Sequence, residues 1–239
     1  MIEVQDLYKS FGSVDALKGV SFRAPDGQVT GIIGPNGAGK TTTLRILYTL
    51  LRPDRGQALV DGFDSVRSPR EVQARIGVLP DVRGLYPRLT GREHIRYFGR
   101  LHGMNGSELS QRIDGLVSTL GMEAFADRRA KGFSKGQTLK VALARALVHE
   151  PHNVLLDEPT NGLDVASSRA VRELIDGFRD SGRCVLFSSH IMQEVAALCD
   201  KVVVMSQGRI IHNGTLDELR EATGMHDLEE AYLVAVGER

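Results

Sequence analysis

The sequence predicts an α/β domain organised around a phosphate-binding loop, and three observations support this. A β-branched, uncharged run at residues 29–33 leads into a glycine-rich segment at 34–42 and then into a helical pattern. A second run, at 153–159, is uncharged until it delivers two carboxylates near its end, and a third apolar run, at 183–189, is followed by a histidine. Open α/β sheets bind ligands at the carboxyl ends of their strands, so these ends are the expected site.

Length and composition exclude several classes of protein. The chain has 239 residues, enough for one large domain with a sizeable core. Its 30 basic and 30 acidic residues balance, which argues against a nucleic-acid partner. No signal-peptide pattern opens the chain, and no run approaches about 18 uncharged apolar residues, so the chain is not expected to span a membrane. The two cysteines, Cys184 and Cys199, lack metal-ligand spacing and are expected as buried thiols in a reducing compartment.

The first 26 residues alternate between apolar and polar side chains. This pattern predicts short antiparallel strands joined by a turn at 11–13. Phe11 is expected in a loop just before the glycine-rich unit, where its ring has the chemistry to stack on a purine. A loop phenylalanine taken alone is more often a core residue.

The segment 34–42 reads Gly-Pro-Asn-Gly-Ala-Gly-Lys-Thr-Thr. Its glycines let consecutive backbone N–H groups turn towards a phosphate, and the helix that follows directs its positive end there. The plainer interpretation, a glycine-rich turn before a helix, is disfavoured by the full spacing. The lysine is expected on the β- and γ-phosphates and the first threonine on Mg²⁺. The candidate residues are Gly34, Asn36, Gly37, Ala38, Gly39, Lys40, Thr41 and Thr42.

The middle of the chain mixes strands with a helical stretch. Strands are expected at 57–62 and 75–80, and Asp81 follows the second. From 85 to 129 apolar residues recur at helical spacing, which predicts an α-helical insertion beginning near Thr90. Ser134 is then the expected N-cap of an alanine-rich helix.

The second half of the chain supplies the remaining catalytic candidates. Asp157 ends a buried strand and is placed to hold a metal ion, and Glu158 is placed to polarise a water. His190 ends the next strand, where contact with a γ-phosphate is favoured over a purely structural role. The remaining elements are a turn at 161–164, helices at 166–178, 191–198 and 216–222, a hairpin at 201–212, and a short tail at 223–239.

The motifs in this order resemble those of ATP-binding cassette (ABC) transporter subunits. The segment Phe-Ser-Lys-Gly-Gln at 133–137 is similar to the family signature and lies between the phosphate loop and the paired acids. The resemblance covers the whole chain and implies one ABC ATP-binding domain that hydrolyses ATP. It implies a RecA-like P-loop NTPase core with an antiparallel β-subdomain (1–84 and 130–222), an α-helical subdomain (85–129) and the short C-terminal tail.

The resemblance also implies which residues meet the nucleotide. Two cassettes close head to tail, so that each ATP lies between the phosphate loop of one and the signature of the other. Lys40, Glu158 and His190 would then be catalytic, and Phe11 would stack on adenine. Thr41, Asp157 and Asp81 would serve the Mg²⁺ ion. The residues expected to contact nucleotide across the dimer are Ser134, Gly136, Gln137 and Asp164.

Three positions depart from the family pattern. Asp81 stands where a glutamine is usual, and its shorter, anionic side chain would reach a metal-bound water with altered geometry. Lys135 replaces a signature glycine, so it is either strained, if a positive φ is needed, or adds a cation near the γ-phosphate. Phe133 replaces a leucine. Lys40, Asp157, Glu158 and His190 are all present, so the expected activity is retained.

The partner and cargo follow only from the resemblance. Segments 76–81, 133–137 and 228–233 are similar to NatA-type sodium-export cassettes of bacteria. A separate transmembrane permease subunit is expected to dock at 81–90, and the second cassette is an identical copy or a paralogue. The location implied is cytoplasmic, peripheral on the inner face of the cell membrane. Export of a drug or other hydrophobic substrate and iron–sulfur assembly by a soluble ABC ATPase stay open as alternatives, whereas Glu158 and His190 argue against a scaffold without turnover. Cassettes for DNA repair or ribosomes fit poorly, because the chain has neither a coiled-coil insertion nor a duplicated cassette.

Overall fold

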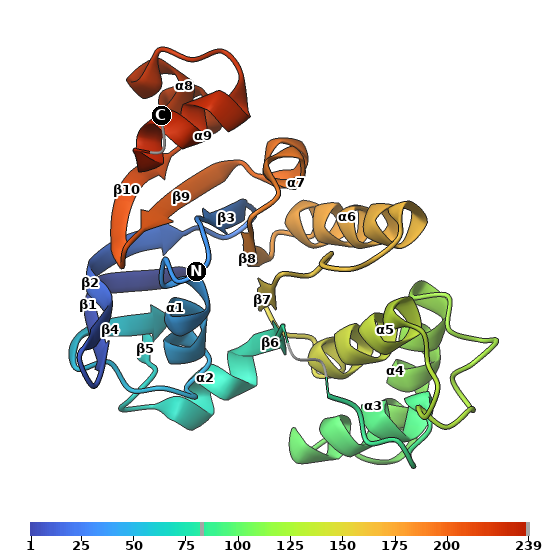
Figure 1. Cartoon of the computed structure of the whole chain (residues 1–239). Coiled ribbons are helices and arrows are strands. Elements are labelled where there is room, and N and C mark those ends of the chain that lie inside the picture. Colours follow the sequence, from blue (N-terminus) through green and yellow to red (C-terminus); the bar gives the residue numbers. More distant parts are fainter. Residues whose placement is uncertain (82–83, 238–239) are drawn as a thin grey trace.

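A computed structural model describes residues 1–81 and 84–237 of the chain. Its largest element is a six-stranded sheet with the order β10-β9-β3-β8-β7-β6 (Figure 1). The strands at its centre are parallel, and β10 joins one edge as an antiparallel strand. The six strands are β3 (Val29–Ile33), β6 (Ile76–Leu79), β7 (Asn153–Asp157), β8 (Cys184–Ser189), β9 (Lys201–Ser206) and β10 (Arg209–Gly214).

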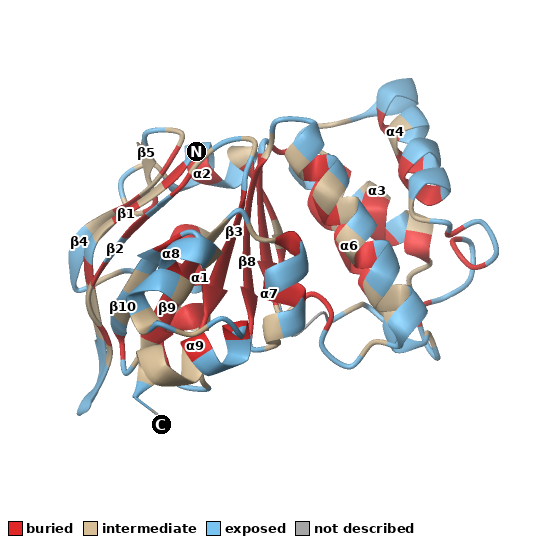
Figure 2. Ribbon diagram, turned by 90° about the horizontal axis from the view of Figure 1, so that it is seen from above, coloured by how far each residue is buried: buried red, intermediate tan, exposed pale blue. Residues whose placement is uncertain are grey.

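Successive side chains of the central strands enter two different cores. On β7, Val154 and Leu156 belong to one buried cluster, and Leu155 belongs to the cluster on the opposite face. Every residue of β3, β7 and β8 is buried, as the colouring of β3 and β8 shows in Figure 2. Parallel strands covered on both faces read as continuous apolar runs, which explains why the sequence marks them so clearly.

A four-stranded antiparallel sheet with the order β2-β1-β4-β5 forms the second layer. Its strands are β1 (Ile2–Phe11), β2 (Val14–Ala24), β4 (Arg55–Val60) and β5 (Phe63–Asp64). The sheet and helix α1 (Lys40–Leu47) share one buried cluster with the central strands. Phe11, expected in a loop, is instead the last residue of β1, because its backbone still pairs with Val14 of β2.

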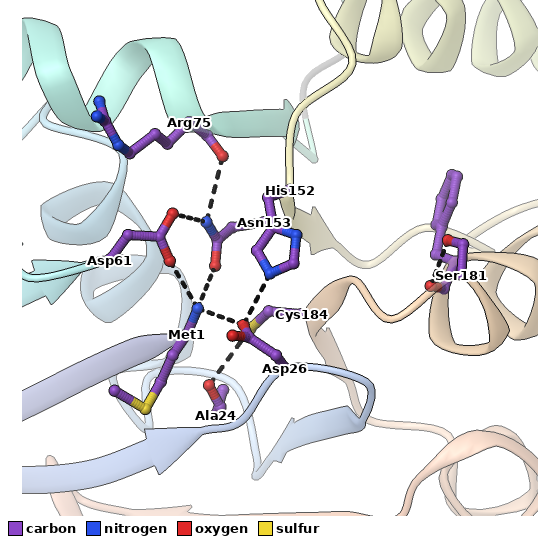
Figure 3. Close-up of polar contacts among 10 residues, drawn as sticks. Met1, Ala24, Asp26, Asp61, Arg75, His152, Asn153, Ser181 and Cys184 are labelled. Atoms are coloured by element: carbon purple, nitrogen blue, oxygen red, sulfur yellow. Dashed lines mark hydrogen bonds and ion pairs between the residues drawn. The ribbon is translucent and has the colours of Figure 1, made fainter.

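A polar cluster joins the two sheets at the start of β1 (Figure 3). The Met1 ammonium group donates hydrogen bonds to Asp26, to Asp61 at 2.7 Å and to the side-chain oxygen of Asn153 at 3.0 Å. The amide nitrogen of Asn153 in turn donates to Asp61 at 2.8 Å. His152 pairs with Asp26 at 3.0 Å. These contacts attach the first strand of the antiparallel sheet to β7 of the central sheet.

Three helices lie together on the far side of β6: α3 (Gly91–Leu101), α4 (Gly106–Thr119) and α5 (Lys135–Leu147) (Figure 1). Thr90 caps α3, since its side chain accepts from Glu93 N and Glu93 reaches back to Thr90 N. The helix start expected at Thr90 is therefore confirmed. Ser134 caps α5 in the same way.

The remaining helices complete the α/β arrangement: α2 (Pro69–Arg75), α6 (Val165–Asp180), α7 (Met192–Leu198), α8 (Leu216–Thr223) and α9 (Leu228–Val236). The expectation of a tail at 223–239 is wrong in one respect, because α9 lies within it. Asp227 accepts hydrogen bonds from the backbone of Glu229 and Glu230, both at 3.0 Å, and so caps this helix. Leu228 and Ala231 are buried against β9.

The expected fold class is confirmed: a parallel α/β core with a phosphate loop, an antiparallel sheet and a helical layer. Among the residues described, no helix combines the length and apolar character needed to cross a bilayer.

Candidate active site

The phosphate loop lies between β3 and α1, as expected, and close packing requires glycine at two of its positions. A Cβ atom on Gly34 would lie 2.2 Å from the carbonyl oxygen of Met205. Gly39 has a φ of 106°, and a Cβ there would lie 2.8 Å from the carbonyl oxygen of Ala16. A larger residue at either position would displace the loop from β9 or from β2.

Lys40 is buried at the start of α1, beneath this loop. Its ammonium group donates to the carbonyl oxygens of Gly34 at 2.6 Å and Pro35 at 3.2 Å. Burial lowers the pKa of Lys40, and the carboxylates of Glu158 and Asp157 oppose that shift. The cation is thus held by its own loop and is attracted by two acids at the end of β7.

Asp157 is connected to the loop and to the next strand by hydroxyl groups. Thr41 Oγ1 lies 3.3 Å from Asp157 Oδ1, and Ser188 Oγ donates to the same oxygen at 2.6 Å. Ser188 also accepts a hydrogen bond from the backbone N–H of Glu158 at 3.1 Å. The Ser188 hydroxyl therefore holds both acids: it binds the carboxylate of Asp157 and the backbone N–H of Glu158.

These oxygens suit a magnesium ion. Mg²⁺ takes hard oxygen ligands and is usually held by one or two carboxylates together with phosphate oxygens and water. Thr41 and Asp157 supply a hydroxyl and a carboxylate side by side. In the described parts of the chain, no group of three or more His, Cys, Asp or Glu residues forms a complete protein cage for a metal. The hydroxyl of Thr41 and the carboxylate of Asp157 therefore suit a metal ion that takes its other ligands from phosphate groups and water.

Glu158 and His190 form a pair at the ends of β7 and β8. His190 Nδ1 lies 2.8 Å from Glu158 Oε2, and because a carboxylate only accepts, the imidazole donates. Glu158 has a φ of 49°, an uncommon value for a residue with a side chain. Such backbone strain is found where a side chain must be aimed at a site.

A cavity of about 600 Å³ brings these groups together. Its lining includes the loop residues 36–42 together with Phe11, Asp81, Glu158 and His190. The Phe11 side chain is 48% exposed, and Lys9 Nζ lies 5.5 Å from its ring centre. Gly34 and Asp157 are buried and do not line the cavity. The lining also contains Val14, Asp15, Ala16 and Asn161, which the sequence did not identify.

The signature residues lie apart from this cavity. Ser134 Oγ accepts from Gln137 N at 3.2 Å, and Gln137 Oε1 accepts from Ser134 N at 3.1 Å. Asp164 caps α6 by accepting from Ser167 N at 2.8 Å, and this bond and that from the Ser167 hydroxyl lower its pKa. Within one chain, therefore, the structure does not bring Ser134, Gly136, Gln137 or Asp164 to the phosphate loop.

The structure shows the surroundings of two residues that depart from the family pattern, Lys135 and Asp81. Lys135 is the first residue of α5 and does not have a positive φ, so the lysine is not strained. Asp81 is exposed and lines the cavity, so its carboxylate faces the same space as Glu158. Of the predicted docking segment 81–90, Val82 and Arg83 lie outside the described residues.

Comparison with known proteins agrees with this geometry. The family model described as "ABC transporter" matches residues 17–161. The chain is 46% identical over 238 residues to "ABC transporter ATP-binding protein NatA" of Bacillus subtilis, covering 98% of this chain and 97% of that protein. It is 38% identical to "Daunorubicin resistance ATP-binding protein DrrA3" of Streptomyces coeruleorubidus, covering 93% and 71%.

A solved structure described as "Structure of ATP binding subunit of ABC transporter" superimposes with a TM-score of 0.91 at 30% identity, covering 98% of this chain and 99% of that one. The phosphate loop, the paired acids and the signature helix thus occur in a chain that matches ABC cassettes along nearly its whole length. The chain belongs to the ABC transporter family, as an ATP-binding subunit with ATPase activity.

Proposed function

We propose that the chain binds ATP with Mg²⁺ in the 600 Å³ cavity and hydrolyses it to power export through a separate membrane subunit. The observation that carries this proposal is that Lys40, Thr41, Glu158 and His190 line one cavity at the ends of three neighbouring strands, with Asp157 hydrogen-bonded to Thr41 beside it. Phe11 supplies an aromatic face at the same cavity, suited to a purine ring.

Each residue has a role that its surroundings support. Loop N–H groups and Lys40 bind the β- and γ-phosphates, and Thr41 and Asp157 hold Mg²⁺, which neutralises phosphate charge. Glu158 orients and polarises the attacking water. His190, which donates to Glu158 through Nδ1, contacts the γ-phosphate. The Asp81 carboxylate, which lines the same cavity, would also serve the metal ion.

The separation of the signature from the cavity supports pairing of two cassettes. Ser134, Gly136, Gln137 and Asp164 surround the beginnings of α5 and α6, away from the phosphate loop. Helix N-termini attract anions, so a second copy or a paralogue would present these residues to the phosphates. Turnover then requires two chains.

The surface for the membrane subunit is proposed beside the helical layer. A groove of about 800 Å³ runs between α2 and the helices α3 and α5, and its lining includes Leu50, Arg70 and Leu101. Leu50 and Leu101 are 67% and 65% exposed, and Tyr86 near the same helices is 55% exposed. Exposed apolar side chains of this size are typical of a protein contact. Attachment there places the chain on the cytoplasmic face of the membrane.

For the cargo we propose Na⁺ or another small solute, on the likeness to sodium-export cassettes. The 38% identity to a daunorubicin resistance protein supports a drug or other hydrophobic substrate as the second candidate. Sodium flux into vesicles that contain the chain and its membrane partner, measured against drug uptake, separates the two.

We also propose that the chain divides into a core with the antiparallel sheet (1–84 and 130–222), a helical part (85–129) and a C-terminal segment (223–239). The turns on both sides of the α3–α4 pair support this division.

The catalytic assignment is tested with Glu158→Gln. This variant keeps the shape of the side chain and loses the carboxylate, so it should bind ATP, stop hydrolysis and accumulate as an ATP-dependent dimer. Light scattering after gel filtration with ATP and Mg²⁺ measures the dimer. Glu123→Gln, an exposed residue in the turn after α4, is the matched control and should behave as the parent protein. Hydrolysis by Glu158→Gln at the parental rate would refute the assignment.

A further inference from the structure

The side chain of Lys135 lies against the loop that joins β7 to α6. A Cβ atom placed on Gly162 of that loop would lie 2.9 Å from Lys135 Nζ, 3.6 Å from Cδ and 3.8 Å from Cε. Gly162 has a φ of 70° and is exposed. The methylene groups and the ammonium group of Lys135 therefore cover the loop at its glycine.

Two neighbouring contacts join the same segments. A Cβ on Gly136 would lie 3.1 Å from Ser167 Oγ at the start of α6. Phe133 and Leu163, one from each segment, pack against the same buried cluster. Residues 133–136 thus lie close to the loop and to the start of α6, and Lys135 is the residue among them whose side chain reaches Gly162.

The opposite side of this loop faces the cavity. Glu158 and Asn161 both line the cavity. Asn161 N donates to Glu158 O at 3.2 Å, and Leu163 N donates to Thr160 O at 3.1 Å, so the loop is a short hydrogen-bonded unit. A displacement of Gly162 is therefore expected to move Glu158, which lies four residues earlier in the same loop.

The other end of α5 contacts the segment 81–90, which the sequence predicts to dock on the membrane subunit. Arg145 donates to the carbonyl oxygen of Gly84 at 2.9 Å, and its guanidinium carbon lies 5.1 Å from the ring centre of Phe98 on α3. Helix α5 has 13 residues and spans about 20 Å at about 1.5 Å per residue. One rigid helix therefore connects Gly84 to the loop that carries the proposed base.

We propose that Lys135 is a positioning residue. Its side chain holds the 158–164 loop against α5, so that a displacement of α5 at its Arg145 end changes the position of Glu158 in the same chain. The proposal rests on the proposed function in that Glu158 is taken as the base. Within residues 1–81 and 84–237 Lys135 has no ion pair, so packing of its methylene groups carries the contact.

The test compares Lys135→Ala, which removes the side chain, with Lys135→Met, which keeps an unbranched stem without charge. Lys131→Met is the matched control, because Lys131 is an exposed lysine in the turn before the same helix. ATP hydrolysis gives kcat and KM, and amide hydrogen exchange of residues 158–164 in the nucleotide-free full chain reports loop opening.

Lys135→Ala should lower kcat about fivefold, leave KM for ATP within about twofold, and speed exchange in residues 158–164. Lys135→Met should restore both properties, and Lys131→Met should match the parent. Unchanged exchange in Lys135→Ala overturns the proposal. Equal losses in the Ala and Met variants with a raised KM also overturn it, since they would assign the effect to charge near the nucleotide. A parent protein without ATPase activity would defeat the proposed function, whereas the exchange comparison would still decide whether Lys135 holds the loop.

Discussion

Replacing Ser188 by alanine should destabilise the protein and slow catalysis together. Ser188 is fully buried, donates to Asp157 at 2.6 Å and accepts from Glu158 N at 3.1 Å. A hydrogen bond to a charged group contributes about 1.5–3 kcal/mol, and a buried donor left without a partner costs about 1–3 kcal/mol. Because neighbouring losses are not additive, we expect the free energy of unfolding to fall by about 3 kcal/mol. For a chain of this size that corresponds to a thermal midpoint about 6–12 °C lower.

Differential scanning fluorimetry and steady-state ATP hydrolysis measure the two effects. Ser189→Ala is the control, because Ser189 is equally buried and bonds to Glu194 and Ile191 instead of the two acids. It should lower the midpoint and leave kcat close to that of the parent. Ser188→Ala should lower kcat as well, since Asp157 and the Glu158 backbone lose their common anchor. If Ser188→Ala lowers only the midpoint, to the same degree as Ser189→Ala, the role of Ser188 in positioning the acids is refuted.

Two further predictions concern stability. Gly177 lies inside α6, where an added Cβ meets nothing within 4 Å, so Gly177→Ala should raise the free energy of unfolding by about 1 kcal/mol in urea denaturation. Gly208→Ala, with a φ of 79° and a Cβ only 2.8 Å from the carbonyl oxygen of Ala16, should lower it, and a gain there would contradict the reasoning. Burial lowers the pKa of His149 from 6.5 to about 4, so between these values the unfolded chain binds a proton that the folded chain does not. The free energy of unfolding should therefore fall as the pH drops through this window, and His149→Phe, whose ring keeps the stack on His102, should show a shallower fall; equal slopes would refute the assignment.

The elements that the sequence predicted are those with a strong local signal. Strands buried on both faces appear as uncharged runs, and α3 and α5 begin at capping residues. Helix α2 was missed because it has 7 residues and buries only Val72, too little for a periodic pattern. In α9 nearly every position from Ala231 to Val236 is apolar, so no polar face marks the helix.

The residues of the candidate site also divide into those that the sequence predicted and those that it missed. Lys40 follows from the spacing of the glycine-rich segment, and Asp157 and Glu158 follow from the end of an apolar run. Ser188 was missed because a serine within a buried strand belongs to no motif, although a polar residue at a position between apolar neighbours was a usable signal. Asn161 lines the cavity because of the conformation of the turn that contains it, and the sequence pattern does not predict that conformation.

The charge balance of the cavity constrains how a nucleotide enters it. Four carboxylates lie in or beside a space whose buried cation is Lys40: those of Asp15, Asp81, Asp157 and Glu158. An added triphosphate increases the negative charge in a partly desolvated site, where repulsion is stronger than in water. One ammonium group, already bonded to Gly34 and Pro35, does not offset that charge. A divalent ion held by Asp157 would offset it, which is the physical reason to expect that the substrate is the magnesium complex of ATP rather than the free nucleotide.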